Sequence, residues 1–217
     1  MPHLLLARHG ESEYNSKNLW TGLTDSPLTD KGRGQAATMA GAINDLKPDV
    51  AFTSMLSRAQ DTLQIILQTN NWAEIPTYFN KSLNERDYGE YTGLNKLEVE
   101  HKVGHDKFIK IRRGWDEPVP GGETLKMVYQ RMVVCFNDHI LPEIKRGKSV
   151  LLVAHGNSLR ALIKHLDGLN DSEIESVEMP LVEIVVYNYE VRIASKQVRQ
   201  FQAQLPFVTV NSTYIKQ

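Results

Sequence analysis

The chain contains a single cysteine, Cys135, among its 217 residues. It can therefore form no intrachain disulfide, and no zinc or iron–sulfur site built on cysteine ligands is available to it. Chains that fold without disulfides are typical of a reducing compartment, so we expect this protein to be cytoplasmic.

Long apolar stretches are also missing. The longest uninterrupted apolar runs, at 132–136 and 150–154, have five residues each, whereas a membrane-spanning helix needs about 20. The first residues, MPHLLLAR, offer a run of only four apolar residues before Arg8, which is too short for the hydrophobic part of a secretory signal. Both features predict a protein that neither crosses a membrane nor is exported.

Neither sign of charge is in excess. Lysine and arginine total 25 against 26 aspartate and glutamate residues, a formal net charge of −1. Proteins that coat nucleic acid or anionic membranes carry a basic excess, so we expect neither as a partner. Hydrophobic residues make up 41% of the chain and charged residues 24%, which is typical of a globular protein. We expect one domain spanning residues 1–217.

Short apolar segments alternate with amphipathic ones along the chain. Apolar runs predict strands at 3–7, 49–53, 149–154 and 183–189. Helical periodicity predicts helices that begin after Thr29, near Ser57, after Thr124 and behind the strand at 149–154, the third of them ending at Pro142. Alternation of this kind predicts an α/β domain of three layers, with a mainly parallel central sheet and helices on both faces.

Two segments have a weaker pattern. Residues 80–122 are rich in charged and aromatic side chains and glycine turns, and we expect them to form a functional excursion over the core. No element can be assigned from the sequence between residues 191 and 217.

Two histidines stand in matching places. His9 in ARHG and His155 in AHGN each follow an apolar strand directly, and each is followed by glycine. Ligands of parallel sheets bind at the carboxyl ends of strands, so we expect both imidazoles at one edge, although 146 positions separate them. A neutral imidazole nitrogen can attack phosphorus, which makes His9 the candidate nucleophile.

Arginines near these turns suit a phosphoryl group, which spreads negative charge over its oxygens. Arg8 precedes His9, and Arg58 lies at the head of the second predicted helix. Helix N-termini near Ser57 and Asn157 are expected to add backbone N–H donors toward the same anion. Each of these residues taken alone is more often an ordinary loop or surface residue, but the set indicates a phosphate site.

Longer motifs occur in a fixed order along most of the chain. They are RHGES at 8–12, WTG at 20–22, LNERDYGEYTGLNK at 83–96, RRG at 112–114 and AHGNSLRALIKHL at 154–166. With these motifs the chain resembles the histidine phosphatase superfamily, and more closely its cofactor-dependent phosphoglycerate mutase branch.

This resemblance implies roles for individual residues. His9 would become phosphohistidine, with Arg8, Arg58 and His155 around the phosphoryl group, and Glu85 would be the acid and base for the substrate hydroxyl. Without the motif, Glu85 would be interpreted as a surface carboxylate paired with Arg86. The resemblance further implies a substrate-binding set that consists of Ser12, Asn15, Thr21, Gly22, Tyr88, Lys96, Arg112, Arg113, Gly156 and Asn157.

The implied reaction belongs to glycolysis and gluconeogenesis, and interconverts 3-phosphoglycerate and 2-phosphoglycerate. It would need 2,3-bisphosphoglycerate as a primer and no metal. Two alternatives stay open: a histidine phosphatase that hydrolyses a small anionic ester, and a non-catalytic phosphate-binding scaffold.

His101 and His105 have the spacing of a helical metal pair, but HKVGH contains a glycine and lacks the glutamate of HExxH, so we expect no metal there. Glu123 either lines the pocket or opens the following helix.

The chain also departs from the family pattern in three places. Only residues 116–120 stand where longer members carry an insertion that resembles part of an oligomer interface, so we expect a monomer but leave a homo-oligomer open. Before the last predicted strand it reads EMPLVEIVVY, without the Pro-Thr-Gly common there. Its final residues, NSTYIKQ, lack the Ala/Gly/Lys-rich composition of the usual lid. Because a reduced lid lets water into the site, we expect measurable hydrolysis of bisphosphoglycerate.

Overall fold

A computed structural model describes residues 1–189 and the strand at 194–200. Its centre is a six-stranded sheet with the order β3-β2-β4-β1-β5-β6. Strands β3, β2, β4 and β1 run parallel to one another, while β5 pairs antiparallel with β1, and β6 with β5. The strands are β1 (His3–Arg8), β2 (Val50–Thr53), β3 (Thr77–Phe79), β4 (Val150–Ala154), β5 (Glu183–Tyr189) and β6 (Ala194–Gln200). The mainly parallel sheet predicted from the sequence is confirmed.

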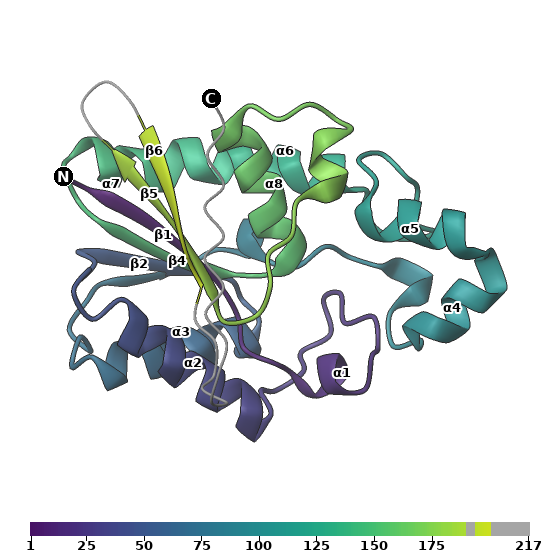
Figure 1. Ribbon diagram of the computed structural model, residues 1–217, viewed down its shortest axis with the longest axis horizontal. Coiled ribbons are helices and arrows are strands. Elements are labelled where there is room, and N and C mark those ends of the chain that lie inside the picture. The colour runs from purple at the N-terminus through teal and green to yellow at the C-terminus, as the bar shows by residue number, and fades with distance from the viewer. Residues whose placement is uncertain (190–193, 201–217) are drawn as a thin grey trace.

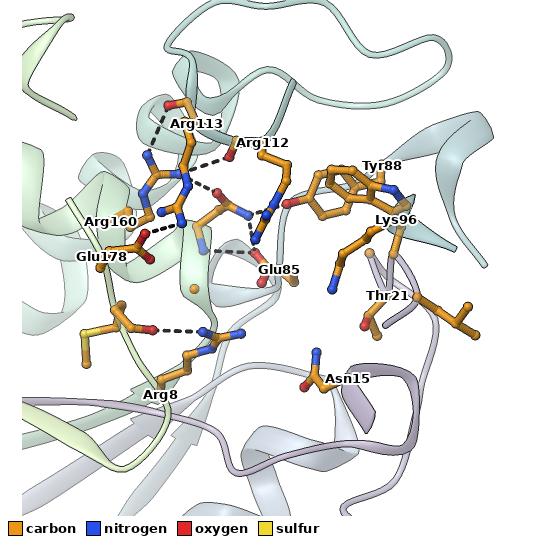
Figure 2. Close-up of a pocket in the computed structure, with 16 residues that line it drawn as sticks. Arg8, Asn15, Thr21, Glu85, Tyr88, Lys96, Arg112, Arg113, Arg160 and Glu178 are labelled. Atoms are coloured by element: carbon orange, nitrogen blue, oxygen red, sulfur yellow. Dashed lines mark hydrogen bonds and ion pairs between the residues drawn. The ribbon is translucent and has the colours of Figure 1, made fainter. Parts of the chain in front are cut away.

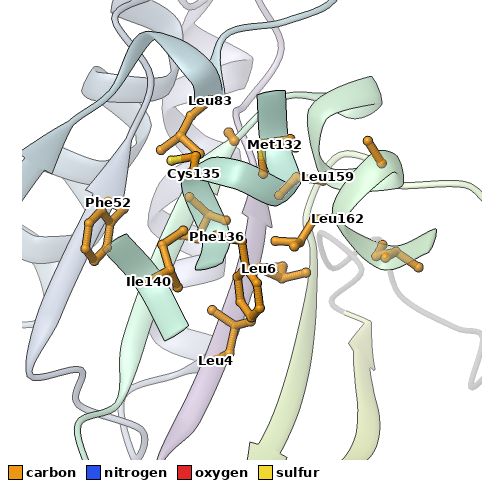
Figure 3. Close-up of a cluster of buried hydrophobic side chains, with 14 of the residues drawn as sticks. Leu4, Leu6, Phe52, Leu83, Met132, Cys135, Phe136, Ile140, Leu159 and Leu162 are labelled. Atoms are coloured by element: carbon orange, nitrogen blue, oxygen red, sulfur yellow. The ribbon is translucent and has the colours of Figure 1, made fainter. Parts of the chain in front are cut away.

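Helices cover both faces of this sheet (Figure 1). On one face lie α2 (Asp30–Ala42) and α3 (Ser57–Thr69), and on the other α6 (Leu125–Cys135), α7 (Leu141–Lys145) and α8 (Gly156–Asp167). Side chains alternate along each strand, so Leu5 joins the apolar cluster with α2 and α3, whereas Leu4 and Leu6 join the one with α6 and α8. Figure 3 shows this second cluster, where Phe136 and Ile140 pack over the central strands. The predicted three layers are confirmed.

The four helices predicted from the sequence all begin where it places them, α6 after Thr124 and α8 directly behind β4 among them. Thr29 caps α2, and its side-chain oxygen accepts a hydrogen bond from the Gly32 N–H at 3.0 Å. Helix α3 begins at Ser57 without a cap from the preceding residue. Asp25 replaces that cap, because its carboxylate accepts from the Ser57 N–H at 2.8 Å. The loop before α2 is thereby tied to the start of α3.

The helix predicted to end at Pro142 continues beyond it. Helix α6 passes into a π-helical turn at Phe136–Ile140 and then into α7, which extends to Lys145. A proline inside an α-helix has no N–H to donate, and its ring crowds the carbonyl four residues back. Here Pro142 lies in the first turn of α7, where the N–H is not needed. The prediction that the helix ends at Pro142 is therefore wrong.

The excursion at 80–122 contains structure that the sequence pattern did not reveal. It holds α4 (Lys96–Val103) and α5 (His105–Arg113), which lie apart from the two helical layers (Figure 1). Gly104, with φ of 83°, separates the two helices, so exposed His101 and His105 do not share one helix face. The excursion also holds two short turns of helix, η1 (Lys81–Leu83) and η2 (Gly89–Tyr91). Two further short helices lie elsewhere in the chain, α1 (Glu13–Ser16) and η4 (Glu173–Ser176).

No helix within residues 1–189 is both long and apolar enough to cross a membrane. The final NSTYIKQ segment, on which the expectations of a reduced lid and of bisphosphoglycerate hydrolysis rest, lies outside the described residues.

Candidate active site

The two His-Gly turns lie side by side at the carboxyl edge of the sheet. Strands β1 and β4 are parallel neighbours, with Arg8 opposite Ala154, and the His9 N–H donates to the Ala154 carbonyl at 3.0 Å. The next residues, His9 and His155, are both buried, and their ring centroids are 4.9 Å apart. Strand pairing alone brings together two residues that are far apart in the sequence.

The surroundings of His9 fix which of its nitrogens carries the proton. Nδ1 lies 2.6 Å from the carbonyl oxygen of Gly10, which can only accept, so the proton sits on Nδ1 and Nε2 keeps a lone pair. Burial lowers the pKa of His9 well below its ordinary value of 6.5, and the nearby charges of Arg58 and Arg8 lower it further. At neutral pH, His9 is therefore an uncharged imidazole with an available nitrogen.

His155 is held by a serine from a third strand end. Its Nε2 lies 2.7 Å from Ser54 Oγ, which also accepts from the Leu56 N–H at 3.2 Å. Burial lowers the pKa of His155 well below 6.5, with Arg58, His9 and Arg8 contributing in that order. Sequence reasoning missed Ser54, although its position could have identified it, because it directly follows β2 as the two histidines follow β1 and β4.

Two guanidinium groups, that of buried Arg58 and that of half-buried Arg8, supply positive charge near the histidines. Arg58 donates to the carbonyls of Thr24 and Gly22, both at 2.9 Å, and Arg8 donates to the Met179 carbonyl, also at 2.9 Å. Burial is the main cause that lowers the pKa of Arg58, to about 10, so it stays charged at neutral pH. Within the described part of the chain, the Nε–H groups of Arg8 and Arg58 have no hydrogen-bond partner. Buried, unpaired N–H donors of this kind fit an oxyanion.

Glu85 lies in the interior and does not form the surface pair that its sequence neighbours suggest. Its Oε1 accepts from the Asn157 N–H at 3.1 Å and from the Arg86 N–H at 2.8 Å. The Arg86 guanidinium points elsewhere, to the carbonyls of Glu123 and Ile111. The remaining oxygen, Oε2, lies on the side of Gly156, where a Cβ would come within 3.7 Å of it. One carboxylate oxygen is thus held by the protein, while the side chain lines the pocket.

At each of the two predicted helix N-termini, one backbone N–H group already has a partner. The Ser57 N–H donates to Asp25, and the Asn157 N–H donates to Glu85. These two donors position carboxylates of the protein, and arginine and lysine side chains of the pocket wall supply positive charge for a ligand.

Most of the substrate-binding set lines one pocket beside this edge (Figure 2). The sequence-derived residues in its wall are Arg8, Asn15, Thr21, Gly22, Glu85, Tyr88, Lys96, Arg112, Arg113, Gly156 and Asn157. His9, His155 and Arg58 are buried and are not in the wall, although the chain neighbours of both histidines, Arg8 and Gly156, are. Burial and the charges of Arg112 and Arg8 lower the pKa of Lys96 to about 8.

Ser12 acts through its neighbour and does not line the pocket. It caps α1, and its N–H and Oγ lie 3.2 and 3.1 Å from Asn15 Oδ1. With the oxygen of Asn15 held in this way, its amide nitrogen points into the pocket (Figure 2). Glu123 is not in the wall either. It pairs with Arg131 at 2.8 Å and accepts from the Asp87 N–H at 3.0 Å, while Thr124 caps α6.

The pocket also contains residues to which the sequence assigned no role. Arg160 donates to Asn157 Oδ1 at 2.9 Å and to the Arg113 carbonyl at 3.0 Å, so it connects α8 to the end of α5. Its position one helical turn after Asn157 is the signal that could have found it. Glu178 forms an ion pair with Arg113, and no sequence motif pointed to it. The other unassigned wall residues are Leu19, Trp20 and Met179.

Among the described residues, no three or more His, Cys, Asp or Glu side chains gather as a metal-binding group. The charged groups of this site are instead an array of cations with two carboxylates, those of Glu85 and Glu178, beside two buried imidazoles. Such an array can bind a small anion with more than one phosphate or carboxylate group, transfer a phosphoryl group through nitrogen, and move a proton.

Comparison with known proteins agrees with this chemistry. Residues 4–198 match the family model of the histidine phosphatase superfamily (branch 1). A 2,3-bisphosphoglycerate-dependent phosphoglycerate mutase of Parvibaculum lavamentivorans is 44% identical over 88% of this chain and 92% of its own length. One from Cytophaga hutchinsonii is 46% identical over 82% of this chain and 84% of its own length.

Solved structures share the fold at lower identity. The Bacillus stearothermophilus protein YhfR superposes with a TM-score of 0.81 at 23% identity, covering 93% of this chain and 98% of its own. A mycobacterial glucosyl-3-phosphoglycerate phosphatase in complex with VO3 gives 0.78 at 22% identity, covering 94% and 100%. With the family model matched over nearly the whole chain, this protein belongs to the histidine phosphatase superfamily.

Proposed function

We propose that this protein is a phosphoglycerate mutase that interconverts 3-phosphoglycerate and 2-phosphoglycerate through a phosphohistidine at His9. The observation that carries the proposal is the state of His9, a neutral imidazole with its proton held by the Gly10 carbonyl at 2.6 Å and two arginines nearby. The names of relatives that are 44% and 46% identical support the same reaction.

The pocket fits a bisphosphorylated primer. The unpaired Nε–H groups of Arg8 and Arg58 suit the phosphoryl group that reacts, and Lys96, Arg112 and Arg113 in the wall suit a second anionic group. When bound, 2,3-bisphosphoglycerate supplies the phosphoryl group that first loads His9.

The forward reaction then has two transfers at the same nitrogen. In the first, the 2-hydroxyl oxygen of 3-phosphoglycerate bonds to phosphorus as the Nε2–P bond of phosphohistidine breaks, and Glu85 takes the hydroxyl proton. In the second, Nε2 of His9 bonds to the phosphorus on O3 as its P–O bond breaks, and Glu85 returns the proton to O3. The product is 2-phosphoglycerate, and His9 is phosphorylated again.

Cationic side chains stabilise the negative charge that develops on the phosphoryl oxygens during each transfer. Arg8 and Arg58 face the three equatorial oxygens of the phosphoryl group, which hold most of that charge. Between the transfers the glycerate must turn without leaving, and Lys96, Arg112 and Arg113 give it an anchor for the group that does not react. A simple hydrolase needs no such second anchor, which favours the mutase over the phosphatase.

The test follows the formation of 2-phosphoglycerate from 3-phosphoglycerate by coupling to enolase, after removal of free metal by chelation, with and without trace 2,3-bisphosphoglycerate. The magnesium that enolase requires is added only in a second, stopped assay. We expect turnover that the primer stimulates and the chelator does not reduce. Release of inorganic phosphate without 2-phosphoglycerate would instead identify a phosphatase. If neither 2-phosphoglycerate nor inorganic phosphate is formed, the protein is a binding protein.

A further inference from the structure

One acidic side chain stands in the cationic part of the pocket wall. Glu178 lines the pocket and forms an ion pair with Arg113 (Figure 2). The Glu178 side chain is 57% exposed and that of Arg113 is 23% exposed, so the pair lies at the rim with the arginine on the covered side. In the free protein, a cation suited to the ligand is thus already paired with a carboxylate.

The backbone around Glu178 is fixed independently of this ion pair. Arg8 donates to the Met179 carbonyl at 2.9 Å. On the other side of Glu178, Arg160 donates to the carbonyls of Val177 at 2.9 Å and Ile174 at 2.8 Å. Because these bonds use backbone oxygens, replacing the Glu178 carboxylate by an amide leaves the segment in place.

The carboxylate has a direct effect on charge in the pocket. Arg8, Lys96, Arg112 and Arg160 share the wall with Arg113, and the negative charge of Glu178 is felt at Arg8 and Arg160 as well as at Arg113. A ligand group that approaches Arg113 must either displace Glu178 or lie beside a like charge. A ligand confined to the vicinity of His9 leaves the ion pair in place, so it meets only the effect that Glu178 has through Arg8.

We infer that Glu178 is a specificity-determining residue, which competes for Arg113 with the second anionic group of a bisphosphorylated ligand. This inference rests on the proposed function, since that function names the ligand. By weakening one anchor, Glu178 allows the bound bisphosphate to leave Arg113 and turn between the two transfers. A site without Glu178 holds the bisphosphate more tightly.

The experiment measures binding, not turnover. All proteins carry His9→Asn, so that no phosphoryl group is transferred during the titration. Calorimetry at constant ionic strength compares this background with versions that also carry Glu178→Gln or Glu175→Gln. Glu175 is an exposed acid in the same segment that is not in the pocket wall, so its variant makes the same change of charge away from the ligand. The probes are 2,3-bisphosphoglycerate and inorganic phosphate.

We expect Glu178→Gln to tighten binding of 2,3-bisphosphoglycerate about fivefold, which equals about 1 kcal/mol and is the size expected of a partly exposed ion pair. Binding of inorganic phosphate should change less than about twofold, and Glu175→Gln should match the background for both probes. Unchanged or weaker binding of the bisphosphate by Glu178→Gln overturns the inference, and so does equal tightening for both probes.

The same data separate this inference from the proposed function. If the His9→Asn protein binds the bisphosphate and responds as expected, while the unsubstituted enzyme forms no 2-phosphoglycerate, the inference stands and the mutase proposal fails. If mutase turnover is present but Glu178→Gln has no effect on binding, only the inference fails. A background protein that binds 2,3-bisphosphoglycerate no better than phosphate overturns both.

Discussion

In the proposed reaction, His9 owes its reactivity as a nucleophile to one carbonyl and two arginines. The Gly10 carbonyl, 2.6 Å from Nδ1, holds the proton on the nitrogen away from the reacting atom, and burial with Arg58 and Arg8 keeps the ring uncharged. Replacing the imidazole removes the nucleophile and leaves the cations in place. A substitution at His9 therefore tests the chemistry of the proposal directly.

For His9→Ala we expect loss of phosphoenzyme and a fall in turnover of at least about 10⁴-fold, because no other group can accept the phosphoryl. The enolase-coupled rate and labelling with radioactive phosphate measure this, and circular dichroism checks the fold. His139→Ala is the matched control, since His139 is exposed and remote from the pocket wall, and it should keep full activity. Turnover of His9→Ala above a blank without enzyme would contradict the assignment.

For Glu85→Gln we expect kcat to fall about 10²–10⁴-fold, the usual contribution of a general acid and base. The amide can keep the acceptor oxygen for the Asn157 N–H, now at 3.1 Å, so KM should change little. Steady-state kinetics with 3-phosphoglycerate separates the two constants. A loss of less than tenfold in kcat, or one confined to KM, would assign Glu85 to binding instead of proton transfer.

At the scale of elements, the turn after β1 lies directly on the first turn of α2. A Cβ at Gly32 would collide with the Glu11 carbonyl oxygen, and one at Gly10 with the Gly32 carbonyl oxygen. Gly34 lies in the same helix, yet a Cβ there would meet no atom within 4 Å in the described structure. Gly32 and Gly34 therefore provide a test position and a matched control position within one helix.

We expect Gly32→Ala to destabilise the fold by about 1–3 kcal/mol through overpacking, and to lower kcat because it displaces the turn that orients His9. Gly34→Ala should instead stabilise by up to about 1 kcal/mol, since alanine is the better helix former. Urea denaturation and the enolase-coupled assay measure both effects. Equal stability changes in the two variants would show that the close contact is relieved by movement of α2.

The loop before β5 contains a strained residue. Val182 has φ of 65°, a left-handed conformation that a β-branched side chain rarely adopts. Glycine usually costs stability relative to alanine, but at this position the order should reverse. We expect Val182→Gly to be more stable than Val182→Ala by about 1 kcal/mol in urea denaturation. Since both variants lose the buried isopropyl group, the comparison cancels packing, and the ordinary order would argue against strain at this position.

The sequence predicts the elements that have a strong period, and misses those that depend on tertiary contacts. Strands β1, β2, β4 and β5 were predicted from apolar runs. Strand β3 has only three residues and two exposed side chains, so it has no apolar run. The apolar residues of α4 and α5 pack on Trp20 and Tyr88, far from the main core, and their spacing gives a weak helical pattern.

The same limit applies to the candidate site. Residues inside long motifs, such as His9, Glu85 and Lys96, could be predicted because their neighbours in sequence identify them. Ser54, whose Oγ lies 2.7 Å from His155 Nε2, could have been found only from its place directly after β2. Glu178 could not be found at all, because its role comes only from Arg113, a partner that folding brings near. Short-range pattern carries no information on such pairs.

At the scale of the whole molecule, burial of two neutral histidines makes stability depend on pH. The pKa values of His9 and His155 are lowered well below 6.5 in the folded protein, so on acidification the unfolded chain takes up their protons first. Stability is then unaffected by these groups above about pH 6.5 and falls as the pH drops below it. Each histidine contributes about 1.4 kcal/mol per pH unit once its unfolded form is charged.

We expect the free energy of unfolding to decrease by about 2–3 kcal/mol between pH 7.5 and 5.5 from these two residues. Urea denaturation across this range measures how steeply the free energy of unfolding changes with pH. His9→Asn should lower this slope by the contribution of one histidine, because only His155 then remains. An identical slope in His9→Asn and the unsubstituted protein would mean that His9 is protonated in the folded state.

Strand β1 pairs on one side with β4 and on the other with β5, both from the last third of the chain. During synthesis, β1 therefore leaves the ribosome long before either neighbour exists. At about 5–20 residues per second, the wait for β4 is roughly 7–30 s. Throughout that interval the apolar segment HLLLA is an unpaired strand that chaperones or other nascent chains can bind, and His9 at its end cannot reach His155 until more than two thirds of the chain has been made.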